Sequence, residues 1–258
     1  MIPVFRAFLR LVCFFLVSLI TVIVVAAGNL LLGIFNREWA VSWKNRVIKS
    51  WAWMTGFIIG LRLTKKGEPP EPPFFLVSNH LSYIDVVLLW RYLDATFVAK
   101  SEVKSWPFFG WGTRTLGVLF IDRDLKRDVR RMNERISQNI SDRQGVILFP
   151  EGTSTKGEEV ASFNASLLQY PAEREMPVHY ASLSYRTSSG QQPAERSVCW
   201  WGDMEFIPHF WNLLKLKRFS GSITFGESPV VANDRKELGE KLRAAVLEGF
   251  VPVVEDSR

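Results

Sequence analysis

The chain has 258 residues, and its 32 basic and 26 acidic side chains give a formal net charge of +6. This length accommodates one catalytic domain with a small appendage, and the moderate basic excess suits an anionic membrane surface. Nothing in the sequence resembles a nucleic-acid-binding module. The two cysteines, Cys13 and Cys199, make no disulfide framework, and no Cys/His cluster has metal-ligand spacing. The ten tryptophans favour a membrane as the partner, because tryptophan is enriched at membrane interfaces.

An uncharged segment lies near the N-terminus. Residues 11–36 contain no charged side chain, and this run exceeds the roughly 20 residues needed to cross a bilayer core. More basic residues follow the segment than precede it, which predicts an N-terminus outside and the rest of the chain at the cytoplasmic face of the inner membrane. A signal peptide cleaved after Ala27 is the alternative, but the length favours an uncleaved anchor. A tilted hairpin embedded in one leaflet is a third possibility.

A second membrane-directed element is expected over residues 38–61. Its aromatic and aliphatic residues Trp39, Trp43, Val47, Trp51 and Ile58 fall near one helical face. This pattern is typical of an interfacial helix, although the same spacing fits a helix packed on the protein's own core. A Pro-rich stretch at 67–73 ends the element. We therefore divide the chain into an anchor with an interfacial helix, residues 1–66, and a catalytic domain, residues 67–258.

The remainder alternates short apolar runs with helical patterns, which predicts an α/β fold with a central mixed sheet flanked by helices. Strands are expected at 74–77, 96–99, 117–123, 146–149, 176–185, 197–201 and 222–226. Helices are expected from Ser82 and, with an apolar composition, over 203–215. Amphipathic helices are expected around Val129 to Ile140 and over 234–250.

The strand at 74–77 runs into a polar turn that carries His80, one of three histidines, with Asp85 five positions later. In one interpretation Ser82 and Asp85 form a helix capping box and His80 is an ordinary loop residue. In the other, His80 is a general base whose tautomer Asp85 fixes. The position favours a functional role, because α/β folds place their sites at the carboxyl ends of strands.

The strand at 146–149 leads into a second polar loop. Glu151 supplies a carboxylate there, and Gly152 lets backbone N–H groups approach a ligand. A polar turn with a solvated Glu151 is the alternative interpretation. The loop lacks the Gly-x-x-x-x-Gly-Lys pattern of a P-loop, and Ser154 does not lie in the Gly-x-Ser-x-Gly elbow of serine hydrolases.

Four blocks resemble, in order, those of the glycerophospholipid acyltransferases typified by 1-acylglycerol-3-phosphate acyltransferase, over about residues 70–230. They are Asn79-His80 with Asp85; Gly117 with Phe120 to Arg123; Phe149 to Thr153; and Pro177-Val178. The resemblance implies a membrane-bound enzyme of phospholipid biosynthesis in which His80, oriented by Asp85, deprotonates a lysolipid hydroxyl. That hydroxyl then attacks the thioester of acyl-CoA or acyl-ACP directly, with no cofactor, metal or covalent enzyme intermediate.

The resemblance also implies a phosphate-binding role for Arg123 and for Glu151, Gly152 and Thr153, and Lys100 is a reasonable second phosphate partner. Because a carboxylate does not bind phosphate directly, we expect Glu151 to order the loop or to bind an acceptor hydroxyl. The default acceptor is 1-acyl-sn-glycerol 3-phosphate, which would give phosphatidate.

One departure concerns the acceptor: Ser154 stands where phosphatidate-forming members usually carry arginine. In addition, residues 201–204 with Pro208 and His209 resemble lyso-ornithine lipid acyltransferases. Lyso-ornithine lipid or another lysophospholipid is therefore the alternative acceptor. A non-catalytic lipid-binding protein on the same fold and a thioesterase are the alternatives of other classes.

Overall fold

The computed structural model describes residues 1–105, 109–121 and 126–254. Within them, seven strands form one sheet in the order β1-β7-β6-β2-β5-β3-β4. Strands β6 and β7 pair antiparallel, and the other neighbours pair parallel. The predicted mixed α/β fold is therefore confirmed. The strands are β1 (Leu61–Lys66), β2 (Phe75–Ser78), β3 (Ala95–Lys100), β4 (Leu119–Ile121), β5 (Gly145–Leu148), β6 (Val178–Thr187) and β7 (Phe219–Phe225).

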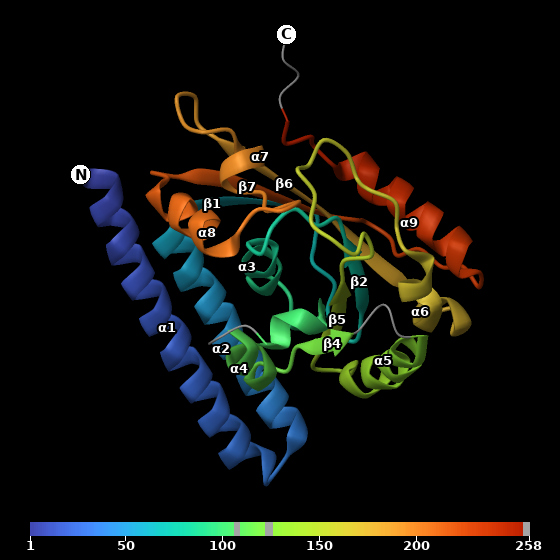
Figure 1. Cartoon of the computed structure of the whole chain (residues 1–258). Coiled ribbons are helices and arrows are strands. Elements are labelled where there is room, and N and C mark those ends of the chain that lie inside the picture. The colour runs from blue at the N-terminus through green and yellow to red at the C-terminus, as the bar shows by residue number, and fades with distance from the viewer. Residues whose placement is uncertain (106–108, 122–125, 255–258) are drawn as a thin grey trace.

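Helices cover both faces of the sheet (Figure 1). They are α1 (Ile2–Gly33), α2 (Arg37–Ile59), α3 (Asp85–Trp90), α4 (Phe109–Thr115), α5 (Lys126–Asn139), α6 (Gln169–Glu173), α7 (Ala194–Ser197), α8 (Phe206–Lys215) and α9 (Arg235–Gly249), with 3-10 turns at Ser101–Ser105 and Ala165–Leu168. Because successive strand residues face opposite ways, Leu76 belongs to the core cluster that includes residues of α1, α2, α3 and α8, whereas Phe75 and Val77 belong to the cluster that includes residues of α5 and α6 and Leu238 and Leu242 of α9. The central strands are therefore buried on both faces, which explains their unbroken apolar runs.

Helices α1 and α2 form an antiparallel hairpin along one flank of the domain (Figure 1). Among the described residues, α1 is the one helix long and apolar enough to cross a membrane. It contacts the domain at its beginning, where Arg10 donates to the carbonyl of Leu216 (2.6 Å). Farther along it packs on α2, where Trp43 Nε1 of α2 donates to the carbonyl of Val24 (3.2 Å). Whether α1 crosses the bilayer or lies with α2 in one leaflet stays a prediction.

The tryptophan stripe of α2 faces the protein core over most of its length. The Trp51 ring packs against Trp90 (5.8 Å between centroids) and Phe14 (6.5 Å). The alternative in which this stripe packs on the core therefore holds for Trp51. The side chains that α2 exposes include Trp39, which begins the stripe, and Trp53 and Phe57, which the stripe does not contain.

Strand β1 links the N-terminal hairpin to the sheet. It begins directly after Gly60, whose φ of 82° ends α2 in a left-handed turn that favours glycine. It then pairs with β7 from Leu61 to Lys66. The segment 1–66 therefore contributes a full strand to the central sheet.

The strand expected at 197–201 is wrong. Ser197 ends α7, and the residues after it form a loop. The amide of Trp200 donates to the carbonyl of Leu81 (2.9 Å), and Trp201 Nε1 donates to the carbonyl of Glu195 (2.8 Å). The apolar residues of this run thus hold a loop over the His80 turn instead of joining a strand ladder.

Candidate active site

The carboxyl ends of β2, β5, β3 and β4 lie along one edge of the sheet, because these strands run parallel. Neighbouring strands in a sheet are about 4.8 Å apart. His80 follows β2, Glu151 follows β5 and Lys100 ends β3. The predicted site residues therefore come to the same edge from separate parts of the chain. Arg123, which the sequence places after β4, lies outside the described residues.

The centre of this edge is a hydrogen-bonded pair of His80 and Asp85. His80 Nδ1 lies 2.7 Å from Asp85 Oδ2, and the carboxylate is fully buried. Asp85 Oδ2 also accepts from the backbone N–H groups of Leu81 (2.7 Å) and Ser82 (3.0 Å). Because the carboxylate only accepts, Nδ1 carries the imidazole proton and Nε2 keeps its lone pair. The pair has the form of a general base with its orienting carboxylate.

The capping-box contacts are formed in the turn before α3, which itself begins at Asp85. The Ser82 hydroxyl accepts from the N–H of Ile84 (3.3 Å), and the Asp85 carboxylate accepts from the N–H of Ser82 (3.0 Å). The hydroxyl of Ser82 also donates to the carbonyl of Val198 (2.6 Å), which ties the turn to the loop above it. Asp85 holds His80 in addition to these contacts, so the two interpretations are compatible at Asp85.

The His80 ring is also held from one face by Phe149, the residue after β5. The two rings stack with centroids 4.1 Å apart and an interplanar angle of 15°. The His80 side chain keeps 22% of its surface exposed. The imidazole is therefore fixed in orientation but open to a substrate.

Tyr185 of β6 completes the coordination of Asp85. Its hydroxyl donates to Asp85 Oδ1 at 2.6 Å, and the side chain is fully buried. Burial, together with the nearby Asp85 charge, raises the pKa of the Tyr185 hydroxyl well above its ordinary value, so that it stays a donor. Sequence reasoning placed Tyr185 in a strand but missed this role.

Asn79 attaches the His80 turn to β6. Its side-chain amide donates to the carbonyl of Leu183 (3.0 Å) and accepts from the N–H of the same residue (2.8 Å). This two-way bond replaces a rung of the ladder at the point where β2 ends. The turn therefore starts from a fixed backbone position.

Glu151 lies against the His80 backbone and is not the solvated residue of a polar turn. Its Oε1 accepts from the N–H of His80 (3.2 Å). Burial, and secondarily repulsion by Asp85, raises the pKa of the Glu151 carboxyl to about 8, although the His80 bond and Arg243 pull it down. Glu151 is therefore largely protonated at neutral pH and adds little negative charge beside the base.

The loop after Glu151 is fixed by its backbone. Gly152 has a φ of 83°, which favours glycine, and the N–H of Thr155 donates to the carbonyl of His80 (2.9 Å). Thr153 is exposed, whereas Ser154 is buried and its hydroxyl donates to the carbonyl of Trp200. The chain thus uses the position after Thr153 to hold the Trp200 loop, and it carries no cation there.

Lys100 shares the sheet edge but not the contacts of the His80 cluster. It lies two strands away from β2, and its exposed ammonium pairs with Glu102 at 2.6 Å. Within the described part of the chain, no group of three or more His, Cys, Asp or Glu residues has the geometry of a metal site.

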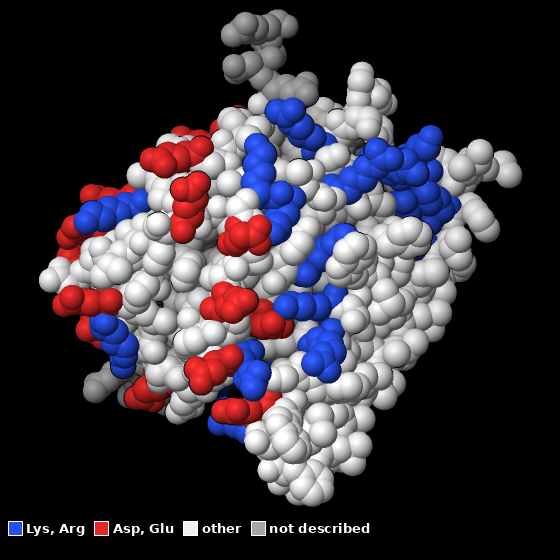
Figure 2. All heavy atoms as spheres, turned by 180° about the vertical axis from the view of Figure 1, so that it is seen from behind, with Lys and Arg blue, Asp and Glu red and all other residues white. Residues whose placement is uncertain are grey.

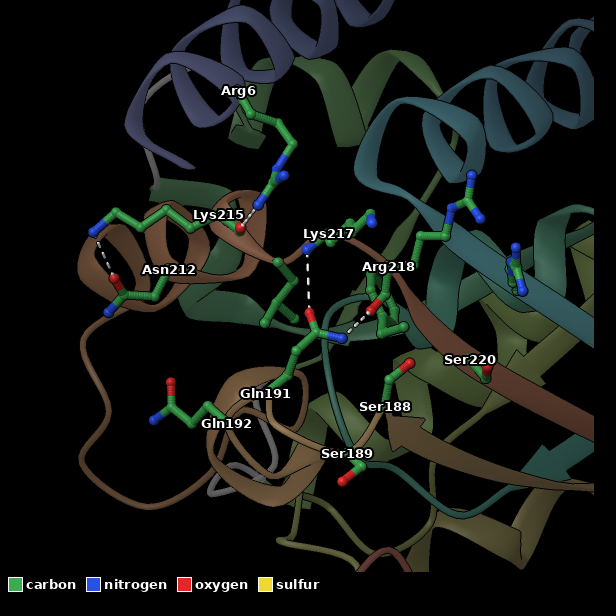
Figure 3. Close-up of a pocket in the computed structure, with 13 residues that line it drawn as sticks. Arg6, Ser188, Ser189, Gln191, Gln192, Asn212, Lys215, Lys217, Arg218 and Ser220 are labelled. Atoms are coloured by element: carbon green, nitrogen blue, oxygen red, sulfur yellow. Dashed lines mark hydrogen bonds between the residues drawn. The ribbon is translucent and has the colours of Figure 1, made fainter. Parts of the chain in front are cut away.

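Two adjoining pockets are lined in part by residues of α8. The first, the basic pocket, has a volume of about 640 Å³ and only cations among its charged lining residues (Figure 3). These cations are Arg6, Arg62, Lys215, Lys217 and Arg218. The second, the mixed-charge pocket, has a volume of about 540 Å³ and shares Gln192 and Asn212 with the first. Its charged lining residues are Lys156, Glu195, Arg196 and Glu205.

Comparisons with known proteins agree with this geometry. A family model described as Acyltransferase matches residues 61–182. Lyso-ornithine lipid O-acyltransferases of Rhodobacter capsulatus and Pseudomonas aeruginosa are 32% and 31% identical, over 75% and 79% of this chain and 71% and 78% of their own. A 1-acyl-sn-glycerol-3-phosphate acyltransferase of Neisseria gonorrhoeae is 27% identical over 73% of each chain. The crystal structure of the 1-acyl-sn-glycerophosphate acyltransferase PlsC from Thermotoga maritima shares the fold, with a TM-score of 0.67 at 20% identity over 95% of this chain and 97% of that one.

Proposed function

This chain belongs to the acyltransferase family that includes lyso-ornithine lipid and 1-acylglycerol-3-phosphate acyltransferases, and we propose that its acceptor is the hydroxyl of lyso-ornithine lipid. The observation that carries the chemistry is the buried Asp85 carboxylate, which holds His80 Nδ1 at 2.7 Å. This arrangement leaves Nε2 as the ring nitrogen that can act as a base.

In the proposed reaction, His80 Nε2 takes the proton of the acceptor hydroxyl as its oxygen attacks the thioester carbonyl. Asp85 stabilises the imidazolium that forms. The tetrahedral intermediate then collapses to the new ester and expels the thiolate, which takes the proton back from His80. Backbone N–H groups around Gly152 are our candidates to stabilise the oxyanion.

Direct transfer is supported by the state of the nearby thiol. Cys199 is buried, and burial followed by repulsion from Asp85 raises the pKa of its thiol well above the ordinary value. The nucleophilic form of cysteine is the thiolate. Cys199 is therefore unsuited to form an acyl-enzyme, and the donor remains acyl-CoA or acyl-ACP attacked by the acceptor itself.

The choice of lyso-ornithine lipid rests on Ser154 and on the relatives. The buried hydroxyl of Ser154 is engaged with the Trp200 loop, so this position supplies no cation to a phosphomonoester. The relatives from Rhodobacter capsulatus and Pseudomonas aeruginosa carry the name of this acceptor.

The second candidate acceptor is 1-acyl-sn-glycerol 3-phosphate, which the Neisseria relative's name specifies. Under that alternative, Arg123, Lys100 and the backbone of Gly152 and Thr153 would bind the phosphate, because cations and amide groups suit it.

We further propose that the hairpin lies in the cytoplasmic leaflet of the inner membrane. Helix α1 exposes a long row of large apolar side chains: Phe5, Phe8, Leu9, Val12, Leu16, Leu19, Ile20, Ile23, Leu30 and Leu31. The basic pocket adjoins its first turns through Arg6, and Figure 2 shows blue side chains gathered beside a broad white surface. Apolar surface next to cations is the pattern of a helix that lies in the interface among anionic headgroups.

The test is acyl transfer by the purified protein from labelled acyl-CoA and acyl-ACP to lyso-ornithine lipid, 1-acylglycerol 3-phosphate and lysophosphatidylcholine. We expect lyso-ornithine lipid to be preferred. His80→Ala should lose roughly 10²- to 10⁴-fold, the usual contribution of a positioned base, while His179→Ala, in β6, serves as the matched histidine control. A folded His80→Ala protein with near-normal turnover would refute the mechanism, and preference for 1-acylglycerol 3-phosphate would select the second acceptor.

A further inference from the structure

The mixed-charge pocket differs from the basic pocket in having both signs of charge. Lys156 and Arg196 contribute cations, and Glu195 and Glu205 contribute carboxylates. The indole of Trp201 forms part of the wall, with Lys156 Nζ 5.8 Å from its ring centroid. Arg196 pairs with Glu195 (3.4 Å) and Lys156 with Glu158 (2.5 Å), so a ligand with both signs of charge can exchange these ion pairs for contacts of its own.

This pocket is attached to the His80 turn by direct contacts. His209, which lines it, has Nδ1 2.9 Å from the hydroxyl of Tyr83, three residues after His80. Lys156 follows Thr155, whose N–H donates to the carbonyl of His80 (2.9 Å). The segments that line the pocket are therefore hydrogen-bonded to the turn that carries His80, so a ligand bound there lies next to that turn.

The same pocket collects residues of the stretch that resembles lyso-ornithine lipid acyltransferases. Trp201, Met204, Pro208 and His209 all line it. The loop that carries Trp201 is held by Ser154, whose hydroxyl donates to the carbonyl of Trp200. An arginine in place of the buried Ser154 would have to displace this loop.

The charges of the pocket select among ligand classes. A phosphomonoester would be repelled by Glu195 and Glu205, and an isolated ammonium would be repelled by Lys156 and Arg196. A ligand that carries a carboxylate and an ammonium on one short aliphatic chain satisfies both pairs, and its ammonium can also approach an indole face. The head group of an ornithine lipid has this form, since its α-carboxylate and δ-ammonium are joined by the ornithine side chain.

We propose that the mixed-charge pocket is the acceptor head-group site and that it recognises a zwitterionic amino-acid head group. Its carboxylate lies toward Lys156 and Arg196, and its ammonium toward Glu195 and Glu205. This assignment rests on the proposed function, because it names the part of the acceptor that the protein reads. It gives Lys156, Arg196, Glu195 and Glu205 roles in acceptor choice rather than in the chemical step.

The test pairs a change in the protein with a change in the substrate. The substrates are lyso-ornithine lipid and the same lipid acetylated on its δ-amine, which removes the ammonium and keeps the carboxylate. For the wild type we expect acetylation to lower kcat/KM about tenfold, the equivalent of a few partly exposed charge contacts. In the double variant Glu195→Gln/Glu205→Gln, that difference should shrink to about twofold, because the carboxylates that sense the ammonium are gone.

The matched control is Glu240→Gln/Glu248→Gln, two exposed glutamates of α9, which should keep the full tenfold difference. Lys156→Gln should lower kcat/KM for both lipids by the same factor, because both retain the carboxylate. Wild-type enzyme that uses the acetylated lipid as well as its parent would overturn the proposal. So would an undiminished difference in the Glu195→Gln/Glu205→Gln variant.

Binding supplies a readout that does not need turnover. Titration of lyso-ornithine lipid into the His80→Ala protein should show binding that Glu195→Gln/Glu205→Gln weakens about tenfold. Equal binding with and without these substitutions overturns the pocket assignment. Absence of His80-dependent transfer to any lysolipid would instead refute the proposed function, and the binding titration would still decide what the pocket holds.

Discussion

The hydroxyl of Tyr185 is the contact of Asp85 that comes from farthest away in the chain, and its removal gives the sharpest test of the site. Tyr185→Phe deletes the donor at 2.6 Å from Asp85 Oδ1 and changes no other heavy atom. Asp85 Oδ2 keeps its bonds to His80 and to the turn amides. The variant therefore leaves the orientation of the imidazole intact while it removes one stabilising dipole from the carboxylate.

The size of the effect follows from what Oδ1 loses. A hydrogen bond to a charged group is worth about 1.5–3 kcal/mol. Because Oδ1 is buried, we expect the free energy of unfolding of Tyr185→Phe to be lower than that of the wild type by an amount in this range. A carboxylate with fewer donors attracts the neighbouring imidazolium more strongly. Because His80 keeps its own bond to Oδ2, kcat/KM should fall by less than about tenfold, the equivalent of about 1.36 kcal/mol.

The assay is kcat/KM together with chemical unfolding of the detergent-solubilised protein. The unfolding free energy should fall by about 1.5–3 kcal/mol, while kcat/KM falls by less than about tenfold. Tyr180→Phe, in the same strand, is the matched control. An unchanged unfolding free energy would show that the Tyr185 hydroxyl does not support Asp85 in solution.

Three further substitutions, two near the site and one in α2, can be tested by unfolding measurements. Between pH 4.5 and 8 the folded wild type keeps a proton on Glu151 that the unfolded chain has released, so its stability should fall with rising pH by up to about 1.4 kcal/mol per pH unit. Glu151→Gln should abolish this decrease. Burial lowers the pKa of Lys44 to about 8, so between pH 8 and 10.5 only the unfolded chain keeps the proton and wild-type stability should rise with pH. Lys44→Met should abolish this increase. Gly152→Ala should cost about 1–2 kcal/mol and lower activity, because φ is 83° there. Parallel stability curves for variant and wild type would contradict the two pH predictions, and an unchanged unfolding midpoint would contradict the third.

The local part of the site could be predicted from the sequence. His80 and Asp85 are five positions apart at the end of an apolar run, and this spacing is enough for one turn to bring them together. Glu151 and Gly152 follow β5, the neighbour of β2 in the sheet, in the same way. Because parallel strands align their carboxyl ends, chain order and strand type together predict that these loops meet.

The long-range contacts could not be predicted in this way. Tyr185 lies 100 positions from Asp85, and Leu183 lies 104 positions from Asn79. Both contacts exist because β6 is the neighbour of β2 in the sheet, and neighbour order depends on the whole topology rather than on any local pattern. A buried tyrosine in a strand is also an ordinary core residue, so its type gave no signal.

The N-terminal hairpin shows a different limit of sequence patterns. Periodicity identified a tryptophan face of α2, but it could not tell whether lipid or protein covers that face. The answer depends on α1: Trp51 Nε1 donates to the hydroxyl of Ser18 (3.0 Å), and its ring packs on Phe14 of the same helix. The bias of basic residues around α1 is likewise a local pattern, and the side of the membrane on which the N-terminus lies stays a prediction.

Asp85 takes part in both the local contacts of its turn and the long-range contacts from β6. Its Oδ2 accepts from groups of its own turn, so sequence alone specifies that half of its surroundings. Its Oδ1 accepts from Tyr185 of β6, and two other residues of this strand, Ser182 and Ser184, donate to carbonyls at and after the end of α9. A change that loosens α9 on β6 therefore reaches the base through one strand and one carboxylate. Substitutions at Ser182 or Ser184 should consequently lower kcat/KM as Tyr185→Phe does, but by less, because they act on the position of the donor and not on its presence.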